Sequence, residues 1–520
     1  MSKDEQSSEL PLNSVHLNTD YQSIQNPSYT QSNSKLNRLE RFIEKLDLTG
    51  VETRGIERIL PEERIDSSIL SKSIIWISAN INIPCFTTGI LGPSIFKLTL
   101  YQSFFTIFLF NSIGIIPIAI ISCFGPASGL RTTVFGRYSW GYYGASIAGF
   151  CVIISGLGWS AIYSITSAQA LRVVFDNQLS IAFGIIIISL IVLIVSFVGY
   201  KWIHHYEQYS WIPIFIAFCI VAICSVKNIK YSQKIISEKI ILTSTNKWNY
   251  FSIISFGALC IANPLSWSSI AADYNTYLPE NSSQMKIFLF TYLGNFVGII
   301  PLQFLGAAVY IGTYTNENWA HAYKINNVGG LLGATVSSLG IFGKFLLLLF
   351  SLSTISTNVM NIYSSSLCFQ VIAPIFQHIP RIFYAIISTI LYVILALISE
   401  DHFNESLVSF MSLCSCFVSI FITIQLEEHF IFRRCSYENY NFNLWNNRKD
   451  LRISFAAIFS GFIGIIGFSL GMSQKWYQGP ISTALSTHNQ GPDLGFLCAF
   501  IFTGITFPLF RLIESFLFHS

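Results

Sequence analysis

Long apolar segments follow one another along most of this chain, separated by shorter polar stretches. The hydrocarbon core of a bilayer is about 30 Å thick, so a helix needs about 20 mostly apolar residues to cross it. The pattern predicts an all-α polytopic membrane protein with 12 transmembrane helices. The predicted spans are residues 74–97, 100–124, 142–171, 179–199, 209–226, 250–272, 285–313, 340–368, 382–399, 403–426, 453–472 and 492–514.

Two of these segments are interrupted at matching places, five helices apart. The first carries Pro84 and Gly89 in its middle, and the second carries Asn263-Pro264. A proline removes a helical hydrogen bond, and a membrane tolerates the freed backbone groups only where they are buried in protein or line a cavity. Such a pair of broken helices indicates the substrate site of a secondary transporter. Its spacing predicts two five-helix repeats of inverted topology, followed by two extra helices.

Composition places the chain in a lipid bilayer. Of its 520 residues only 11% are charged, against about 25% in soluble domains. The net charge of +3 is too small to indicate nucleic acid. Eleven cysteines are scattered without a C-x-x-C motif, so no disulfide framework, metal site or cofactor is expected. The nine histidines form no H-x-x-x-H pattern, and we expect no catalytic residues and no enzyme.

Basic residues are distributed unequally between the two sides of the predicted spans. With the N-terminus inside, the inner side collects twenty Lys and Arg and the outer side nine, which predicts two cytoplasmic termini. The loop at 227–249 opposes this bias, because it places five lysines outside. The expected parts are a largely disordered cytoplasmic tail (1–73), a transport core of helices 1–10 (74–426), a cytoplasmic loop (427–452), helices 11–12 (453–514) and a cytoplasmic C-terminus (515–520). Within the tail, residues 35–48 have the spacing of a short amphipathic helix.

Aromatic residues near the predicted breaks are candidates for binding a flat ring. Trp159 and Tyr163 are four residues apart and share one helix face, and Trp267 follows the second break. Two aromatic faces on either side of a ring add about 0.5–1.5 kcal/mol per aromatic pair beyond burial. The alternative is that each side chain packs in the core.

Polar side chains gather in the segment at 340–368. Asn358 and Asn361 are three residues apart, and a side-chain amide can bind the edge of a nucleobase with two hydrogen bonds. The alternative is that these groups hold neighbouring helices together. In the first broken helix, Thr87 and Thr88 are further candidates for substrate contacts, beside freed backbone carbonyls.

Carboxylates are almost absent from the predicted spans, which limits the choice of a site for a coupling ion. Asp273, at the end of the second broken helix, is the carboxylate candidate. Ser356 and Thr357 are the hydroxyl candidates in the segment at 340–368.

Six motifs occur in order between residues 55 and 364. They are GIERILPEER at 55–64, WISAN at 76–80, GWS at 158–160, SAQ at 167–169, AADY at 271–274 with Pro279, and N-x-x-N-x-Y-S at 358–364. In this order the chain resembles the fungal purine-cytosine permease branch of the nucleobase–cation symporter-1 family, and the resemblance covers roughly residues 50–510.

The resemblance implies a LeuT-like fold of five plus five helices with two extra helices. It also implies uptake of purine bases or cytosine across the plasma membrane by alternating access, with a coupling cation that is expected to be a proton. The family's pocket lies between helices 1, 3, 6 and 8. By motif position, Trp159 and Trp267 would flank the base, Asn358 and Asn361 would bind or orient it, and Thr87 and Thr88 would lie near a hydroxyl position.

One position departs from the family pattern. Cytosine carriers of this branch tend to have Asn four residues after the Trp of helix 3, where this chain has Tyr163. A phenol has a smaller hydrogen-bonding capacity than an amide and adds a ring. Fungal vitamin B6 transporters belong to the same branch, so pyridoxine or another small heteroaromatic ring remains the alternative substrate.

Overall fold

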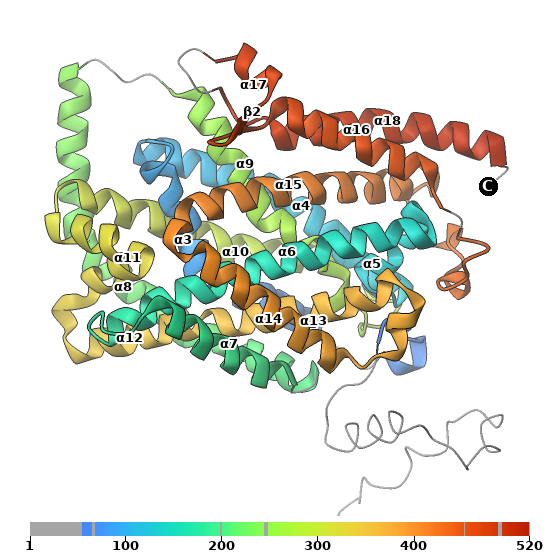
Figure 1. Cartoon of the computed structure of the whole chain (residues 1–520), viewed down its shortest axis with the longest axis horizontal. Helices are drawn as coiled ribbons and strands as arrows, with labels where there is room; N and C mark the ends of the chain where they lie inside the picture. The colour runs from blue at the N-terminus through green and yellow to red at the C-terminus, as the bar shows by residue number, and fades with distance from the viewer. Residues whose placement is uncertain are drawn as a thin grey trace, which may run out of the picture. The chain divides into compact units, whose positions relative to one another are not determined.

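The computed structural model describes residues 55–64, 68–197, 200–243, 248–451, 453–486 and 491–518, all within one compact unit at 51–520. The predicted amphipathic helix at 35–48 and most of the predicted tail lie outside the described residues. The α-helices are α2 (Ile69–Asn80), α3 (Ile83–Ser94), α4 (Leu100–Ser128), α5 (Thr132–Phe135), α6 (Arg137–Val174), α7 (Ile181–Phe197), α8 (Tyr200–Thr243), α9 (Tyr250–Trp267), α10 (Gln284–Ile311), α11 (Glu317–Val336), α12 (Ile341–Leu352), α13 (Thr354–Ile372), α14 (Arg381–Ser399), α15 (Phe403–Glu427), α16 (Phe455–Gly471), α17 (Pro480–Ala484) and α18 (Gly495–Phe518). Strands β1 (Ser473–Gln474) and β2 (Tyr477–Gln478) pair antiparallel in a small hairpin (Figure 1).

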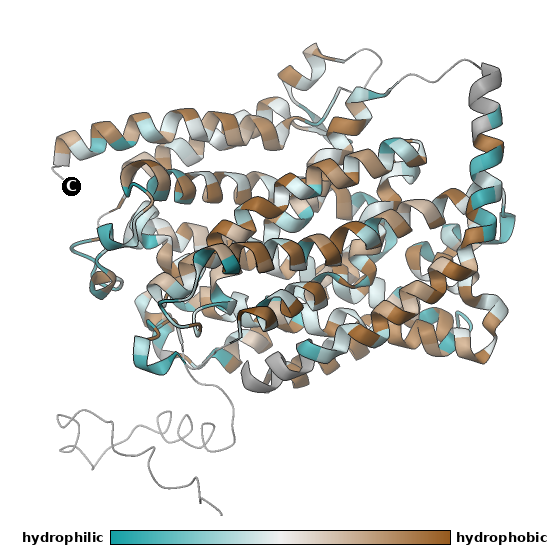
Figure 2. Ribbon diagram, turned by 180° about the vertical axis from the view of Figure 1, so that it is seen from behind, coloured by the Kyte–Doolittle hydropathy of each residue, from teal (hydrophilic) through white to brown (hydrophobic). Residues whose placement is uncertain are grey.

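Every predicted span overlaps a helix. Apolar residues run along these helices, and polar residues collect at their ends and in the loop after α15 (Figure 2). By length and composition, eight helical runs among the described residues can cross a membrane, or nine if α2 and α3 form one bent span. One of those runs contains both α14 and α15, and α7 and α16 are apolar but shorter. The count of twelve crossings and the internal repeat therefore stay predictions.

The first broken helix unwinds earlier than the sequence suggested. Helices α2 and α3 meet at an angle of 57° around Ile81 and Asn82, and residues 83–94 are helical. The Asn82 side chain caps α3 by accepting a hydrogen bond from Cys85 N at 3.0 Å. Pro84 lies in the first turn of α3, where the missing N–H costs little. The predicted interruption at Pro84 and Gly89 was wrong for this reason, because the break lies before both residues.

The second broken helix unwinds later than the sequence suggested. Helix α9 continues through Pro264 to Trp267, and the chain leaves it at Ser268 before a short 3-10 turn over Ala271–Tyr274. A proline removes only the bond to one preceding carbonyl, and packed membrane helices tolerate that loss. The predicted break at Asn263-Pro264 was therefore misplaced by about one turn.

Two further regions differ from the prediction. The expected loop at 227–249 is helical as far as Thr243, since α8 continues with lysines at helical spacing and a Lys234–Glu238 pair four residues apart. Residues 317–336 form the additional helix α11, which changes direction at Asn326 and Asn327.

Close backbone contacts hold the broken helix α3 against α10. A Cβ on Gly89 would lie 1.9 Å from Gln303 O, and a Cβ on Gly306 would lie 2.0 Å from Phe86 O. Small residues of this kind let membrane helices approach closely. On the other side of the bundle α16 and α18 run together above α15 (Figure 1).

Candidate functional site

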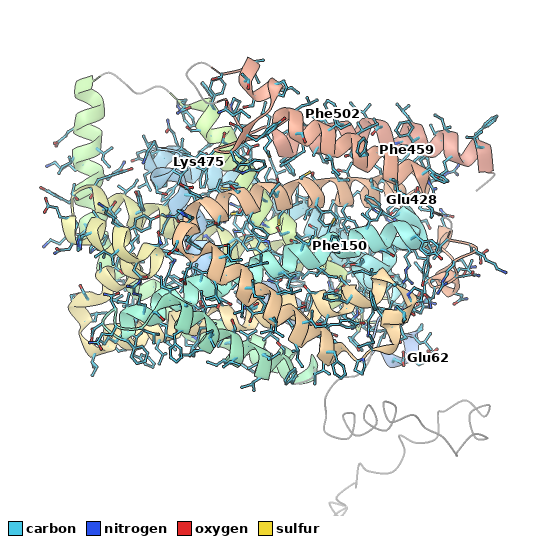
Figure 3. The ribbon with its side chains drawn as sticks, in the orientation of Figure 1. Glu62, Phe150, Glu428, Phe459, Lys475 and Phe502 are labelled. Carbon is cyan, nitrogen blue, oxygen red and sulfur yellow. The ribbon has the colours of Figure 1, made fainter. Side chains whose placement is uncertain are left out.

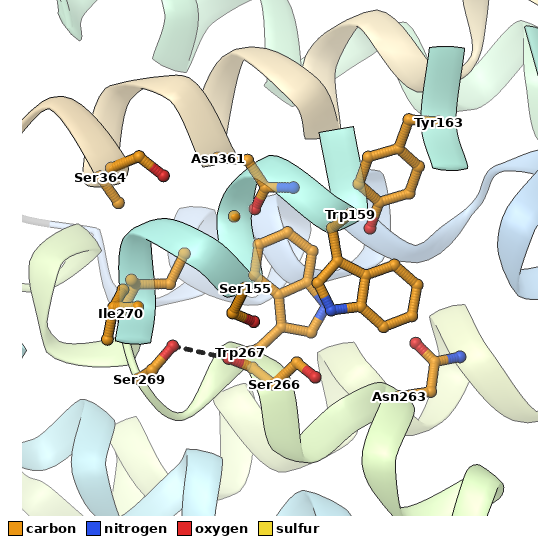
Figure 4. A pocket seen from close by; sticks show the side chains of 13 residues that line it. Ser155, Trp159, Tyr163, Asn263, Ser266, Trp267, Ser269, Ile270, Asn361 and Ser364 are labelled. Carbon is orange, nitrogen blue, oxygen red and sulfur yellow. Dashed lines mark hydrogen bonds between the residues drawn. The ribbon is translucent and has the colours of Figure 1, made fainter. Parts of the chain in front are cut away.

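A small cavity lies where α6, α13 and the end of α9 meet (Figure 4). The volume open to the centre of a water-sized sphere is about 20 Å³, which is room for one or two waters. The site is therefore nearly closed. Its lining residues are Val152, Ser155, Gly156, Trp159, Tyr163, Asn263, Ser266, Trp267, Ser269, Ile270, Asn361, Ser364 and Ser365.

Trp159 and Tyr163 form one aromatic wall of the cavity. Their rings are stacked, with centroids 5.9 Å apart and planes inclined by 27°. Phe410 of α15 meets the indole of Trp159 edge-on at 5.6 Å and supports it from behind. A Cβ on Gly158 would lie 2.0 Å from the Phe410 ring, so the glycine before Trp159 makes this support possible. The indole Nε1 of Trp159 is buried and finds no hydrogen-bond partner in the described part of the chain.

Trp267 forms the second wall, and α2 holds it in place. Its Nε1 donates to Asn80 Oδ1 at 3.2 Å, and its ring meets Trp76 edge-on at 5.8 Å. Asn80 Nδ2 in turn donates to Trp76 O at 2.8 Å and to Asn295 Oδ1 at 3.0 Å. Sequence reasoning quoted the motif that contains Trp76 and Asn80 without giving either residue a role. An asparagine side chain inside a membrane span needs hydrogen-bond partners, and this requirement could have indicated a role for Asn80.

The two predicted asparagines of α13 lie in different surroundings. Asn361 lines the cavity, and its Nδ2 has no partner among the described residues. Asn358 is fully buried away from the cavity, and its Nδ2 donates to Ser164 Oγ at 3.4 Å. The structure therefore brings only Asn361 to the aromatic walls.

Asn263 is a cavity residue that sequence reasoning treated only as part of a helix break. It is 7% exposed, and its Nδ2 is buried. Together with Trp159 Nε1 and Asn361 Nδ2, it makes three buried donor nitrogens at the cavity without a well-formed hydrogen bond in the described part of the chain, and the Asn263 amide lies against the Cys85 thiol, a weak acceptor. Buried donors of this kind cost free energy until an acceptor reaches them.

The threonines of α3 do not reach the cavity. Thr87 Oγ1 donates to Ile83 O at 2.9 Å, and Thr88 Oγ1 donates to Pro84 O at 3.1 Å. Both hydroxyls bond back to their own helix, as Ser and Thr commonly do in apolar surroundings.

Thr357 joins α13 to the end of α2 instead of lining the cavity. Its Oγ1 donates to Ala79 O at 3.0 Å and accepts from Asn82 Nδ2 at 3.3 Å, and Asn82 Nδ2 also donates to Ala79 O at 2.7 Å. The two oxygens are thus bonded to each other, and one amide nitrogen donates to both. The Oγ of Ser356 is buried without a partner and is not among the lining residues.

Asp273 belongs to a buried polar layer that adjoins the cavity lining at Ser364. Its Oδ1 accepts from Thr132 N at 2.7 Å, and its backbone carbonyl accepts from Arg131 Nη1 at 2.8 Å. The neighbouring Tyr274 hydroxyl lies 3.2 Å from Ser364 Oγ, which lines the cavity. The layer therefore connects the turn after α9 to α13 and to the start of α5.

Comparison with known proteins places this geometry in a family. The family model for permeases of cytosine and purines, uracil, thiamine and allantoin matches residues 59–490. The purine-cytosine permease fcyB of Emericella nidulans is 34% identical over 490 residues, which cover 94% of this chain and 93% of that protein. The vitamin B6 transporter TPN1 of Saccharomyces cerevisiae is 27% identical over 526 residues, which cover 92% of this chain and 90% of that protein.

The solved structure of Mhp1, a nucleobase–cation symport-1 family transporter in a closed conformation with bromovinylhydantoin bound, shares the fold. The TM-score is 0.63 at 14% identity, and the match covers 90% of this chain and 95% of Mhp1. The predicted all-α membrane-transporter fold is confirmed. The chain belongs to the family of permeases for cytosine and purines, uracil, thiamine and allantoin, in agreement with its resemblance to the fungal purine-cytosine permeases.

Proposed function

We propose that this protein imports purine bases, cytosine or both across the plasma membrane by alternating access, with both termini in the cytoplasm. The observation that carries the proposal is the pairing of two indole walls with three buried donor nitrogens around one cavity. Purines and cytosine are flat rings that carry ring nitrogens and exocyclic groups as acceptors. Such a ring fits between Trp159 and Trp267 while its edge accepts hydrogen bonds from the amides of Asn263 and Asn361.

The small size of the cavity supports alternating access. A space for one or two waters cannot hold a nucleobase, so a base enters only when the surrounding helices move. The layer around Asp273, Thr132 and Arg131 is the barrier that must open on its side of the site. Release on that side therefore requires these hydrogen bonds to break.

The coupling ion is proposed to be a proton and not sodium. Freed carbonyls at a helix break can coordinate a sodium ion, but here Asn82 Nδ2 donates to both Ala79 O and Thr357 Oγ1, and these two oxygens are bonded to each other. The side-chain amide of Asn82 therefore joins α2, α3 and α13 by hydrogen bonds, without a metal ion. Asp273 remains the carboxylate proposed to respond to protons, since it is buried and bonded across the closed layer.

Uptake of radiolabelled adenine and cytosine in a permease-null yeast tests the substrate proposal. Asn361→Ala should lower uptake at least tenfold at equal surface level, about the effect of 1.4 kcal/mol of lost binding. Asn358→Ala is the matched control, because it removes the same amide three residues away but outside the cavity. Its KM should stay within about twofold of wild type, since it makes no contact at the cavity. Normal uptake by Asn361→Ala, or equal losses in both variants, would refute the assignment.

Pyridoxine is the second candidate substrate, and Tyr163 is the observation that favours it. The phenol stacks on Trp159 at the cavity, where cytosine carriers of the branch tend to have an amide. Competition of labelled cytosine uptake by adenine, hypoxanthine and pyridoxine separates the two. If only pyridoxine competes or is transported, the nucleobase proposal is wrong.

A further inference from the structure

A large apolar groove lies on the other side of α6 from the cavity, between α6, α15 and α16. The volume open to the centre of a water-sized sphere is about 650 Å³, far more than in the cavity. None of the described residues that line it is charged. The lining residues are Trp140, Ile147, Ala148, Cys151, Leu413, Cys416, Phe417, Ile420, Ile458, Gly461, Phe462, Ile465, Phe468, Ser469, Met472, Trp476 and Tyr477.

The groove is long and has aromatic residues at both ends. Its lining residues on α16 run from Ile458 to Ser469, a length of about 16 Å at 1.5 Å per residue. Trp140 marks one end, and Trp476 and Tyr477 of the β-hairpin mark the other. Tryptophan and tyrosine commonly mark the two interfaces of a bilayer. The groove therefore has the length and polarity of a site for a hydrocarbon chain.

Trp140 lines this apolar groove and carries a buried hydrogen-bond donor. The side chain is 5% exposed, and its Nε1 is buried without a partner among the described residues. A buried indole N–H usually finds an acceptor, and Trp140 is the lining residue of the groove that could offer such an N–H.

The Trp140 end also lies beside a positive charge. Tyr142 N donates to Leu451 O at 3.0 Å, which joins this end of α6 to the loop after α15. In that loop the Arg448 guanidinium lies 5.4 Å from the Tyr142 ring centre and also interacts with the Tyr143 hydroxyl. Tyr143 is one helical turn before Ile147 of the groove, so the Arg448 contact with Tyr143 lies about one turn beyond the groove lining on α6.

We propose that the groove binds one phospholipid from the leaflet on the side of the Arg448 loop. One acyl chain lies along α16, an ester carbonyl accepts the hydrogen bond from Trp140 Nε1, and the phosphate lies near Arg448. The cation selects a phospholipid over a sterol, because a sterol has no phosphate to place beside it. The lipid would connect α6 of the transport core to α16, the first of the two predicted extra helices.

Photo-crosslinking tests this proposal on the full chain in nanodiscs of phosphatidylcholine. A phosphatidylcholine with a diazirine in its acyl chain is activated, and mass spectrometry maps the labelled peptides. Label should concentrate on groove residues such as Phe462 and Ile465 over Phe459, which is 57% exposed, lies outside the groove and packs against Phe510 of α18 (Figure 3). Equal labelling of both faces would overturn the proposal.

Two variants separate the parts of the site. Ile465→Trp fills the groove from an exposed position and should remove most of the groove label. Trp140→Phe keeps an aromatic ring but removes the N–H donor together with the pyrrole part of the indole, and should lower the groove label about threefold, the ratio expected for one hydrogen bond in a membrane. Phe459→Trp is the control and should leave the groove label unchanged. The proposal fails if both groove variants keep the wild-type label, if only a photoactivatable sterol labels the groove, or if its residues crosslink to a second copy of the chain.

Discussion

The support of Trp267 by Asn80 gives the most specific prediction of this account. Asn80→Ala removes the acceptor of the indole N–H and also the bond from Nδ2 to Asn295. Hydrogen bonds between membrane helices are worth about 0.6–1.7 kcal/mol each. If the whole of the Trp267 bond serves to hold the indole against the substrate, its loss should raise KM about 3- to 18-fold.

The assay is the concentration dependence of labelled adenine uptake, with surface level measured on the same cells. Asn295→Ala is the matched control, because it breaks the other side-chain bond of Asn80 and leaves the Trp267 acceptor in place. The control should lose stability but should change KM less than Asn80→Ala does. An unchanged KM in Asn80→Ala at normal surface level would refute the proposed role of the bond.

Three further predictions address the packing, the threonines and the coupling ion. Gly89→Ala should abolish the folded protein peak in size-exclusion profiles, because the new Cβ would lie 1.9 Å from Gln303 O. Gly149→Ala is the control and should fold normally, because its Cβ would lie 3.5 Å from the nearest atom. Thr87→Val should change KM for adenine less than about twofold, since the hydroxyl bonds only to its own helix, and a larger rise would place it in the site. Replacing Na⁺ by K⁺ should leave uptake unchanged and a protonophore should abolish it, and a requirement for Na⁺ would contradict the role given to Asn82.

Helix spacing made part of the candidate site predictable. Trp159 and Tyr163 are four residues apart, and any continuous helix brings them to one face, where the structure stacks them. The same rule does not say which part of a face meets a cavity. Asn358 and Asn361 are neighbours on α13, yet only Asn361 reaches the cavity.

Proline positions were a weaker guide, because their cost depends on where a helix begins. Pro84 lies in a first turn that Asn82 caps, and Pro264 lies inside a helix that continues to Trp267. The chain unwinds beside each proline and not at it. The partners of the two threonine hydroxyls of α3 could not be predicted for a similar reason, since a threonine hydroxyl can donate to a backbone carbonyl of its own helix.

Long-range contacts were outside the reach of sequence reasoning. The bond from Trp267 to Asn80 joins residues 187 positions apart, and the bond from Asn80 to Asn295 joins residues 215 apart. No periodicity within one helix encodes such partners.

The most direct test of the central claim is a density map of the full chain with adenine or cytosine bound. The account predicts the base between Trp159 and Trp267, with ring centroids about 4.5–7 Å from each indole and an edge acceptor within hydrogen-bonding distance of Asn361. A base bound elsewhere in the chain, with these three side chains in their present contacts, would contradict it.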